Sequence, residues 1–157
     1  MQALSWSPMS GIMTKWAVLQ EYQISDKDLD AAGTVSDDAL ARWVDAAREA
    51  YLDGCPTLLA AGREPGVALR HRTAALPGGA LLGRPTDVVV TASVKEFRPA
   101  SFTIAVRVRP GGGDREIPVN ASCVVRLDDA ATGEPRQLGN EIRDELIALE
   151  QSASYYN

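Results

Sequence analysis

The chain has 157 residues and a mass of 16.8 kDa, the size of one ordinary domain. Sixteen Lys and Arg against 21 Asp and Glu give a net charge of −5, which argues against a general nucleic-acid binder with a basic face. Two cysteines and one histidine are too few for a disulfide framework or most structural zinc sites, so catalysis would rest on carboxylates, hydroxyls or backbone donors.

Residues 1–15 show no basic stretch followed by a continuous apolar core, the pattern of a secretory signal. We expect them to form a disordered N-terminal extension, with residues 16–157 as a single folded domain. No stretch approaches 18 consecutive apolar residues, so no membrane-spanning segment is expected. Cys55 and Cys123 fit free thiols in a reducing compartment, and the expected location is the cytoplasm.

The clearest helix prediction covers residues 36–53. Its apolar side chains recur at helical spacing and form one stripe: Leu40, Trp43, Val44, Ala47 and Tyr51. Ser36 suits the N-cap, and two aspartates follow it in the first turn, where the helix dipole favours negative charge. Gly54 and Pro56 are expected to stop the helix, and the Gly- and Pro-rich segment that follows is expected to be a loop.

The rest of the chain is predicted to be mainly strand. β-Branched and alternating residues predict strands at residues 16–24, 67–75, 87–97, 102–109 and 119–127, and a second amphipathic helix at 141–152. The last three strands are separated by short turns, which favours antiparallel pairing. The predicted fold class is α+β, with a sheet wrapped around the long helix.

Three short motifs occur in order on the predicted loop, helix and turn. The loop before the helix reads Asp28-Leu-Asp30-Ala-Ala-Gly33-Thr-Val35, and the helix carries Arg42-Trp43-Val44-Asp45-Ala46-Ala47. A later turn reads Lys95-Glu-Phe-Arg98-Pro-Ala-Ser101-Phe102. Together they resemble the patterns D-x-D-x-x-G-x-V, R-W-x-D-A-A and K-E-aromatic-R-x-x-S-F of hot-dog thioesterases of the 4-hydroxybenzoyl-CoA type, over residues 22–150.

The resemblance implies a hot-dog fold, in which an antiparallel five-stranded sheet wraps around a long central helix. It implies hydrolysis of an acyl-CoA or acyl-carrier-protein thioester, with no metal or organic cofactor. It also implies a homo-oligomer: a dimer that pairs two sheets edge to edge, or a tetramer, with active sites at the subunit interface. No nucleic-acid or membrane partner is expected.

Asp30 is the candidate catalytic carboxylate. Thioester hydrolysis needs a base or nucleophile near the carbonyl carbon, and a loop just before a helix places a carboxylate beside the helix's free N–H donors. By resemblance Asp30 matches the family's catalytic aspartate, which acts as nucleophile or as general base on water. The alternative role is that of a turn-forming Asp before a helix, and Asp28 is the weaker candidate, with a structural role in the loop.

The helix start is the candidate oxyanion site. The resemblance implies that the backbone N–H of Asp37 polarises the thioester oxygen, a role that does not depend on the side chain. A second hypothesis makes the carboxylate of Asp37 or Asp38 the catalytic acid, although aspartate is favoured at both positions by the helix dipole alone. The usual aromatic residues of this stretch are absent, so a benzoyl substrate is not implied.

Three residues are candidates for binding the CoA or phosphopantetheine carrier, which needs basic groups for its phosphates. Arg98 and Ser101 match family positions that contact the CoA nucleotide, and Arg136 matches a further basic contact; the alternative for each Arg is a solvated surface charge. A Lys of the family is replaced by Ala100. Fewer basic contacts favour the hypothesis that the acyl group arrives on a carrier protein.

Two other function classes remain open. A hot-dog protein could bind an acyl thioester without hydrolysing it, as the altered helix start and the lost Lys suggest. A hydratase or dehydratase would need a catalytic histidine, and His71, the only one, is flanked by two arginines in a strand outside the dehydratase context. A structural or pocket-lining role for His71 is favoured, and neither cysteine has a neighbouring histidine that would make it a nucleophile.

Overall fold

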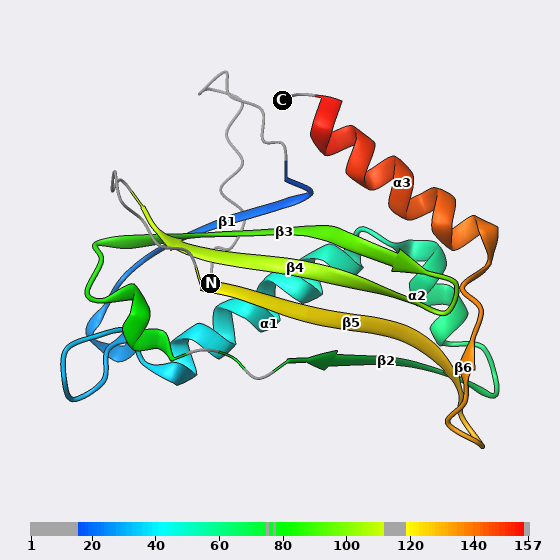
Figure 1. Cartoon of the computed structure of the whole chain (residues 1–157), viewed down its shortest axis with the longest axis horizontal. Helices are drawn as coiled ribbons and strands as arrows, with labels where there is room; N and C mark the ends of the chain where they lie inside the picture. The colour runs from blue at the N-terminus through cyan, green and yellow to red at the C-terminus, as the bar shows by residue number, and fades with distance from the viewer. Residues whose placement is uncertain (1–15, 75, 77, 112–118, 156–157) are drawn as a thin grey trace.

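The computed structural model describes residues 16–74, 76, 78–111 and 119–155. The predicted N-terminal extension, residues 1–15, lies outside the described residues. Within them the chain forms one sheet, three α-helices and two short 3-10 helices (Figure 1).

The sheet is antiparallel throughout and follows the order β1-β3-β4-β5-β2. Its strands are β1 (Val18–Gln23), β2 (Val67–Thr73), β3 (Asp87–Arg98), β4 (Ser101–Pro110) and β5 (Val119–Asp129). All five predicted strands are thus present within a few residues of their expected bounds. The sequence prediction omitted a sixth strand, β6 (Pro135–Arg136), which has only two residues and pairs with the end of β5.

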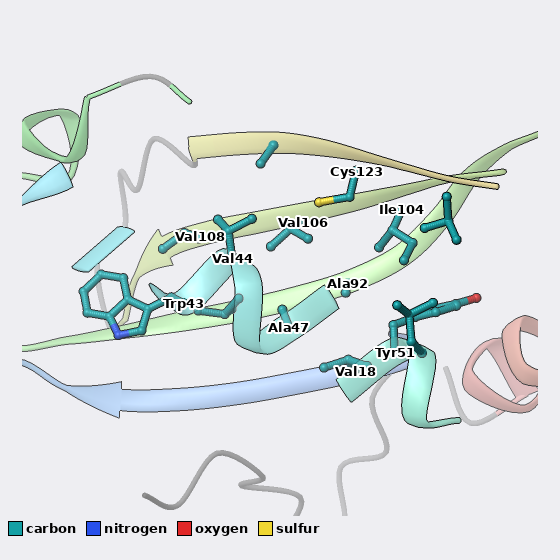
Figure 2. Close-up of a cluster of buried hydrophobic side chains, with 14 of the residues drawn as sticks. Val18, Trp43, Val44, Ala47, Tyr51, Ala92, Ile104, Val106, Val108 and Cys123 are labelled. Atoms are coloured by element: carbon teal, nitrogen blue, oxygen red, sulfur yellow. The ribbon is translucent and has the colours of Figure 1, made fainter. Parts of the chain in front are cut away.

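Helix α1 (Asp37–Asp53) packs across one face of this sheet. Each member of the predicted apolar stripe is buried. Figure 2 shows four of them, Trp43, Val44, Ala47 and Tyr51, on the side of α1 that faces β4. Trp43 stacks on Tyr22 of β1, with ring centroids 5.8 Å apart. Burial of this stripe against the sheet holds α1 in place, because burying one large apolar side chain contributes about 1.5–3 kcal/mol.

The structure corrects the expected loop after α1. Gly54 ends α1 as predicted, but Pro56 begins a second helix, α2 (Pro56–Gly62). Proline suits the first helical position, since its missing N–H would have no intrahelical partner there. Its role here is therefore to start a helix and not to prevent one.

The C-terminal helix α3 (Gly139–Tyr155) is longer than predicted and lies beside β3, beyond the end of β1 (Figure 1). Two of its carboxylates attach it to the rest of the fold. Glu145 accepts hydrogen bonds from the backbone N–H groups of Thr57 and Leu58, in the first turn of α2. Glu150 accepts hydrogen bonds from the Tyr51 hydroxyl, the Ser93 hydroxyl and the Val94 N–H.

Candidate active site

Asp28, the first aspartate of the loop motif, is structural. Its carboxylate is buried, lies 2.5 Å from Nη2 of Arg42 on α1, and accepts a hydrogen bond from the Ser25 N–H at 2.9 Å. The carbonyl oxygen of Asp28 also accepts from the Ser36 N–H at 2.8 Å. The first two motifs therefore meet in space, and together they fix the loop to the start of α1.

Asp30 lies in the tight turn that these contacts position, and it is exposed. Its Oδ1 accepts hydrogen bonds from the N–H groups of Ala32 (2.9 Å) and Thr34 (3.1 Å) and from the Thr34 hydroxyl (3.3 Å). Its Oδ2 meets the Thr34 hydroxyl at 3.3 Å. The turn thus uses mainly Oδ1, and among the described residues Oδ2 of this exposed side chain meets only the Thr34 hydroxyl.

Gly33 gives this turn its shape. Its φ of +83° is a conformation that L side chains rarely adopt, and a Cβ there would lie 3.6 Å from Nη1 of Arg84. The Arg84 guanidinium therefore reaches over the Asp30 turn from the segment before β3. None of the three sequence motifs includes Arg84, which lies in the loop before β3.

The start of α1 offers free backbone donors next to this turn. The Ser36 hydroxyl caps the helix as predicted and accepts from the Ala39 N–H at 3.0 Å. In the part of the chain that the structure describes, no acceptor engages the N–H groups of Asp37 and Asp38. These two donors, at the positive end of the helix dipole, are available to a ligand oxygen.

The Asp37 side chain has a partner that the sequence did not indicate. Its Oδ1 accepts a hydrogen bond at 2.8 Å from the N–H of Gly79, the first residue of the 3-10 helix η3 (Gly79–Leu82). A Cβ on Gly79 would lie 2.6 Å from the Ser36 carbonyl oxygen and 2.7 Å from that of Val35. Only glycine fits this close approach, so η3 packs directly against the start of α1 and bounds the candidate site on that side.

The three candidate carrier-binding residues gather at the other end of the sheet. Arg98 and Ser101 face each other across the β3–β4 turn, and Arg136 lies on β6 beside the end of β5. Arg98 is exposed and pairs with Glu96 at 3.1 Å. The Asp30 turn lies at the start of β3, next to the Val35–Gly83 contact (Figure 1). Because β3 advances about 3.3 Å per residue, the two groups lie roughly 35 Å apart in one chain.

The other titratable candidates do not join the Asp30 turn. His71 is exposed on β2. Cys55 is fully buried behind α1, and burial together with the nearby carboxylates of Glu145 and Glu150 raises the pKa of its thiol to about 12. A thiol with this pKa is protonated at neutral pH, which agrees with the expectation that Cys55 is no nucleophile.

The described residues contain no group of three His, Cys, Asp or Glu side chains that could hold a metal ion. No helix among them combines the length and the apolar character that crossing a membrane requires.

Comparison with known proteins gives structural matches. No protein-family model and no curated protein matches the sequence. The 12:0-ACP thioesterase of Umbellularia californica matches with a TM-score of 0.65 and 13% identity, over 83% of this chain and 52% of that one, so this chain spans about half the length of that enzyme.

Two further matches cover nearly all of the other chain. A thioesterase from Thermus thermophilus, solved with coenzyme A and zinc, gives a TM-score of 0.58 and 21% identity over 88% of this chain and 98% of that one. A mutant of 4-hydroxybenzoyl-CoA thioesterase bound to 4-hydroxybenzoyl-CoA gives a TM-score of 0.56 and 18% identity, over 82% and 97% of the two chains. These likenesses show the fold: the chain has the hot-dog fold of these thioesterases, as the three motifs implied.

Proposed function

We propose that the protein is a thioester hydrolase that cleaves an acyl-CoA or acyl-carrier-protein thioester to the free acid and the thiol. One observation carries the proposal. The exposed Asp30 carboxylate, whose Oδ2 meets only the Thr34 hydroxyl, lies in a turn fixed to a helix start, and the N–H groups of Asp37 and Asp38 there have no acceptor among the described residues. The fold shared with thioesterases that act on such substrates supports it.

In this proposal the Asp37 N–H polarises the thioester carbonyl oxygen, and the negative charge that develops there is stabilised by the helix start. Oδ2 of Asp30 removes a proton from a water molecule while the oxygen of that water attacks the carbonyl carbon. The C–S bond then breaks, and the thiolate takes up the proton. If Asp30 acts as nucleophile instead, Oδ2 attacks the carbonyl carbon, the thiolate leaves, and water hydrolyses the resulting anhydride.

The phosphates of the carrier are proposed to bind to Arg98, Ser101 and Arg136 of one subunit of a homodimer, while the acyl group lies at the Asp30 turn of the other subunit. The free edge of β2 favours this arrangement, since β2 ends the sheet and pairs only with β5 among the described residues. A two-fold axis that pairs β2 with its own copy turns the second sheet end for end. The Arg98 end of one chain then comes to the Asp30 end of the other, and a tetramer would join two such dimers.

A second candidate is binding of an acyl thioester without hydrolysis. It is favoured by the contacts of Asp30, whose Oδ1 is fully used by its own turn, as in an aspartate with a purely structural role. Hydration of an enoyl thioester is less favoured, because it would need His71, which belongs to β2 and not to the Asp30 turn.

Release of free thiol from a panel of acyl thioesters tests the proposal. Each acyl group is offered both on CoA and on a carrier protein, and thiol is measured with a chromogenic reagent. Turnover of at least one substrate is expected, and a preference for the carrier-protein form would support the interpretation of Ala100 as a lost CoA contact. Tight binding with no thiol release from any substrate would favour the binding protein. The two buried free thiols support a reducing, cytoplasmic location.

A further inference from the structure

The face of the sheet that points away from α1 carries a basic hollow of about 500 Å³ over β2 and β5. Arg70 and Arg72 of β2 and Ser122, Val124 and Arg126 of β5 contribute to its lining. None of these residues belongs to the site proposed above.

The strand register explains why the basic groups gather there. Arg70 lies directly opposite Arg126, and Arg72 lies opposite Val124. Residues opposite each other in antiparallel strands share a face of the sheet. Val125 and Leu127 are buried in the core on the α1 side, so Arg126 and Val124, with their partners on β2, lie on the other face.

The positive charge in the hollow is only partly neutralised. Arg126 pairs through Nε with the buried carboxylate of Asp128, at 2.9 Å from Oδ1. Arg70 and Arg72 are exposed and have no hydrogen-bond or ion-pair partner in the described part of the chain. Lys95 adds a further cation at the border, where its Nζ donates to the Ser122 hydroxyl at 2.7 Å.

This concentration of cations is unexpected in a chain with a net charge of −5. Cations held close together repel one another, and a bound multivalent anion offsets that repulsion. Guanidinium groups suit phosphates in particular, because their planar donors match phosphate oxygens two at a time. Val124, 39% exposed between these charges, offers an apolar surface for an organic group attached to the phosphates.

We propose that this hollow binds the phosphates of a small phosphorylated ligand with an organic body, of the class of a nucleoside diphosphate. Arg70 and Arg126 face one phosphate, Arg72 faces the next, and the ring system covers Val124. Such a group could belong to the nucleotide of a coenzyme that carries the substrate, or to a free nucleotide that regulates the protein. The inference does not depend on thioester hydrolysis.

Calorimetric titration of the full chain tests the proposal, with ADP, coenzyme A and inorganic pyrophosphate as probes. Binding of ADP is expected, with backbone amide resonances of β2 and β5 shifting in NMR spectra. The Arg70→Gln/Arg72→Gln variant should weaken binding at least about tenfold, because two charge-assisted contacts are lost. The Arg63→Gln/Lys27→Gln variant removes the same charge from exposed residues outside the hollow and should bind as the wild type does.

The probes also distinguish the two sources of the ligand. Because coenzyme A also has a proposed site at Arg98 and Arg136, the comparison uses the part of each affinity that the Arg70→Gln/Arg72→Gln variant loses. A larger loss for coenzyme A than for ADP identifies the substrate's own nucleotide, and an equal loss identifies a free nucleotide. Unchanged thermal unfolding of the Arg70→Gln/Arg72→Gln variant shows that its fold is intact. No binding of any probe, equal weakening in both variants, or resonance shifts confined to other elements would overturn the proposal. Activity in the thiol-release assay is read separately, so failure of one proposal leaves the other standing.

Discussion

At the scale of single residues, the two oxygens of the Asp30 carboxylate differ in their contacts with the turn, which separates its structural role from its proposed catalytic role. Oδ1 closes the turn through the Ala32 and Thr34 N–H groups, and Oδ2 meets the Thr34 hydroxyl. A structural role and a catalytic role are therefore compatible in one side chain. The Asp28–Arg42 ion pair supports this division, because it holds the loop without using Asp30.

Gly79 is expected to be intolerant of any side chain. A Gly79→Ala substitution places a methyl group 2.6–2.7 Å from two carbonyl oxygens of Val35 and Ser36, so we expect a loss of about 1–3 kcal/mol in the free energy of unfolding. It should also lower activity, since η3 bounds the candidate site at the start of α1. Urea unfolding measures the first effect and thiol release the second.

Gly78 provides the matched control. An added Cβ there meets only Asp37 Oδ1, at 3.7 Å, and its φ of −68° suits alanine. Gly78→Ala should therefore change the free energy of unfolding by less than about 0.5 kcal/mol. Equal effects of the two substitutions on the free energy of unfolding would contradict the close approach of Gly79 to the carbonyl groups of Val35 and Ser36.

Cys55 predicts how stability depends on alkaline pH. Burial raises the pKa of its thiol from 9.0 to about 12, and burial also raises the pKa of the Tyr51 hydroxyl. A group whose pKa is higher in the folded state stabilises the fold below its unfolded pKa, and this stabilisation is lost as the pH rises. The free energy of unfolding should thus fall above pH 9, and less steeply in Cys55→Ala. Urea unfolding at several pH values from 8 to 11 measures this free energy for both proteins. If it falls equally steeply with pH in the wild type and in Cys55→Ala, the raised pKa of the Cys55 thiol is contradicted.

At the scale of elements, the sequence predicted α1 and the five main strands because each has a strong period. The α1 stripe repeats at 3.6 residues, the strands are rich in β-branched residues, and Ser36 caps the helix as its chemistry requires. It failed at α2, which has seven residues and begins with Pro56. A helix this short has little periodicity, and proline marks a helix start as well as a helix end.

The attachment of α3 could not be predicted in the same way. Glu145 and Glu150 have the pattern of the polar face of an amphipathic helix, but their partners lie 56 to 99 residues earlier in the chain. Which polar residues of a helix are buried depends on the surface it packs against, and no local pattern contains that information. For the same reason, the hydrogen bond between the Asp37 carboxylate and the Gly79 N–H could not be predicted from the sequence.

Glu150 should contribute strongly to holding α3 against the core. Replacing it with alanine leaves the buried Tyr51 hydroxyl and the Val94 N–H without their acceptor, which should cost about 2–3 kcal/mol in the free energy of unfolding. Hydrogen exchange should rise in the last turns of α3 and at Val94. Asp144→Ala, at an exposed position of the same helix, should change little. A Glu150→Ala protein as stable as Asp144→Ala would contradict the contact.

At the scale of the whole molecule, the main result is the separation of the candidate groups. The three motifs predicted Asp30 and Arg98 as site residues but not that the Asp30 turn lies near the start of β3 and Arg98 at its end. Pairing of the free edge of β2 with its own copy would bring the two groups together between subunits. A two-fold axis at that edge places the Arg98 end of one sheet beside the Asp30 end of the other. Each chain thus folds as one domain, while the proposed site takes residues from two chains.

Mixing two defective chains tests whether a site is shared. An Asp30→Asn chain and an Arg98→Gln/Arg136→Gln chain should each have low kcat/KM alone. In mixed dimers one of the two sites receives both intact halves, so refolding them together in equal amounts should restore about a quarter of the wild-type activity per site. Activity no higher than the mean of the two separate proteins would place each site within one chain.

The most direct test of the central claim is kcat/KM for thiol release by Asp30→Asn on the best substrate of the panel. The amide oxygen of asparagine still accepts from Ala32 and Thr34, so the turn should persist, but Asn can neither take a proton from water nor act as nucleophile. We predict a fall of about 10²–10⁴-fold with binding of the thioester retained, and near wild-type activity for the exposed control Asp26→Asn. An Asp30→Asn protein that hydrolyses the substrate as fast as Asp26→Asn would contradict the account.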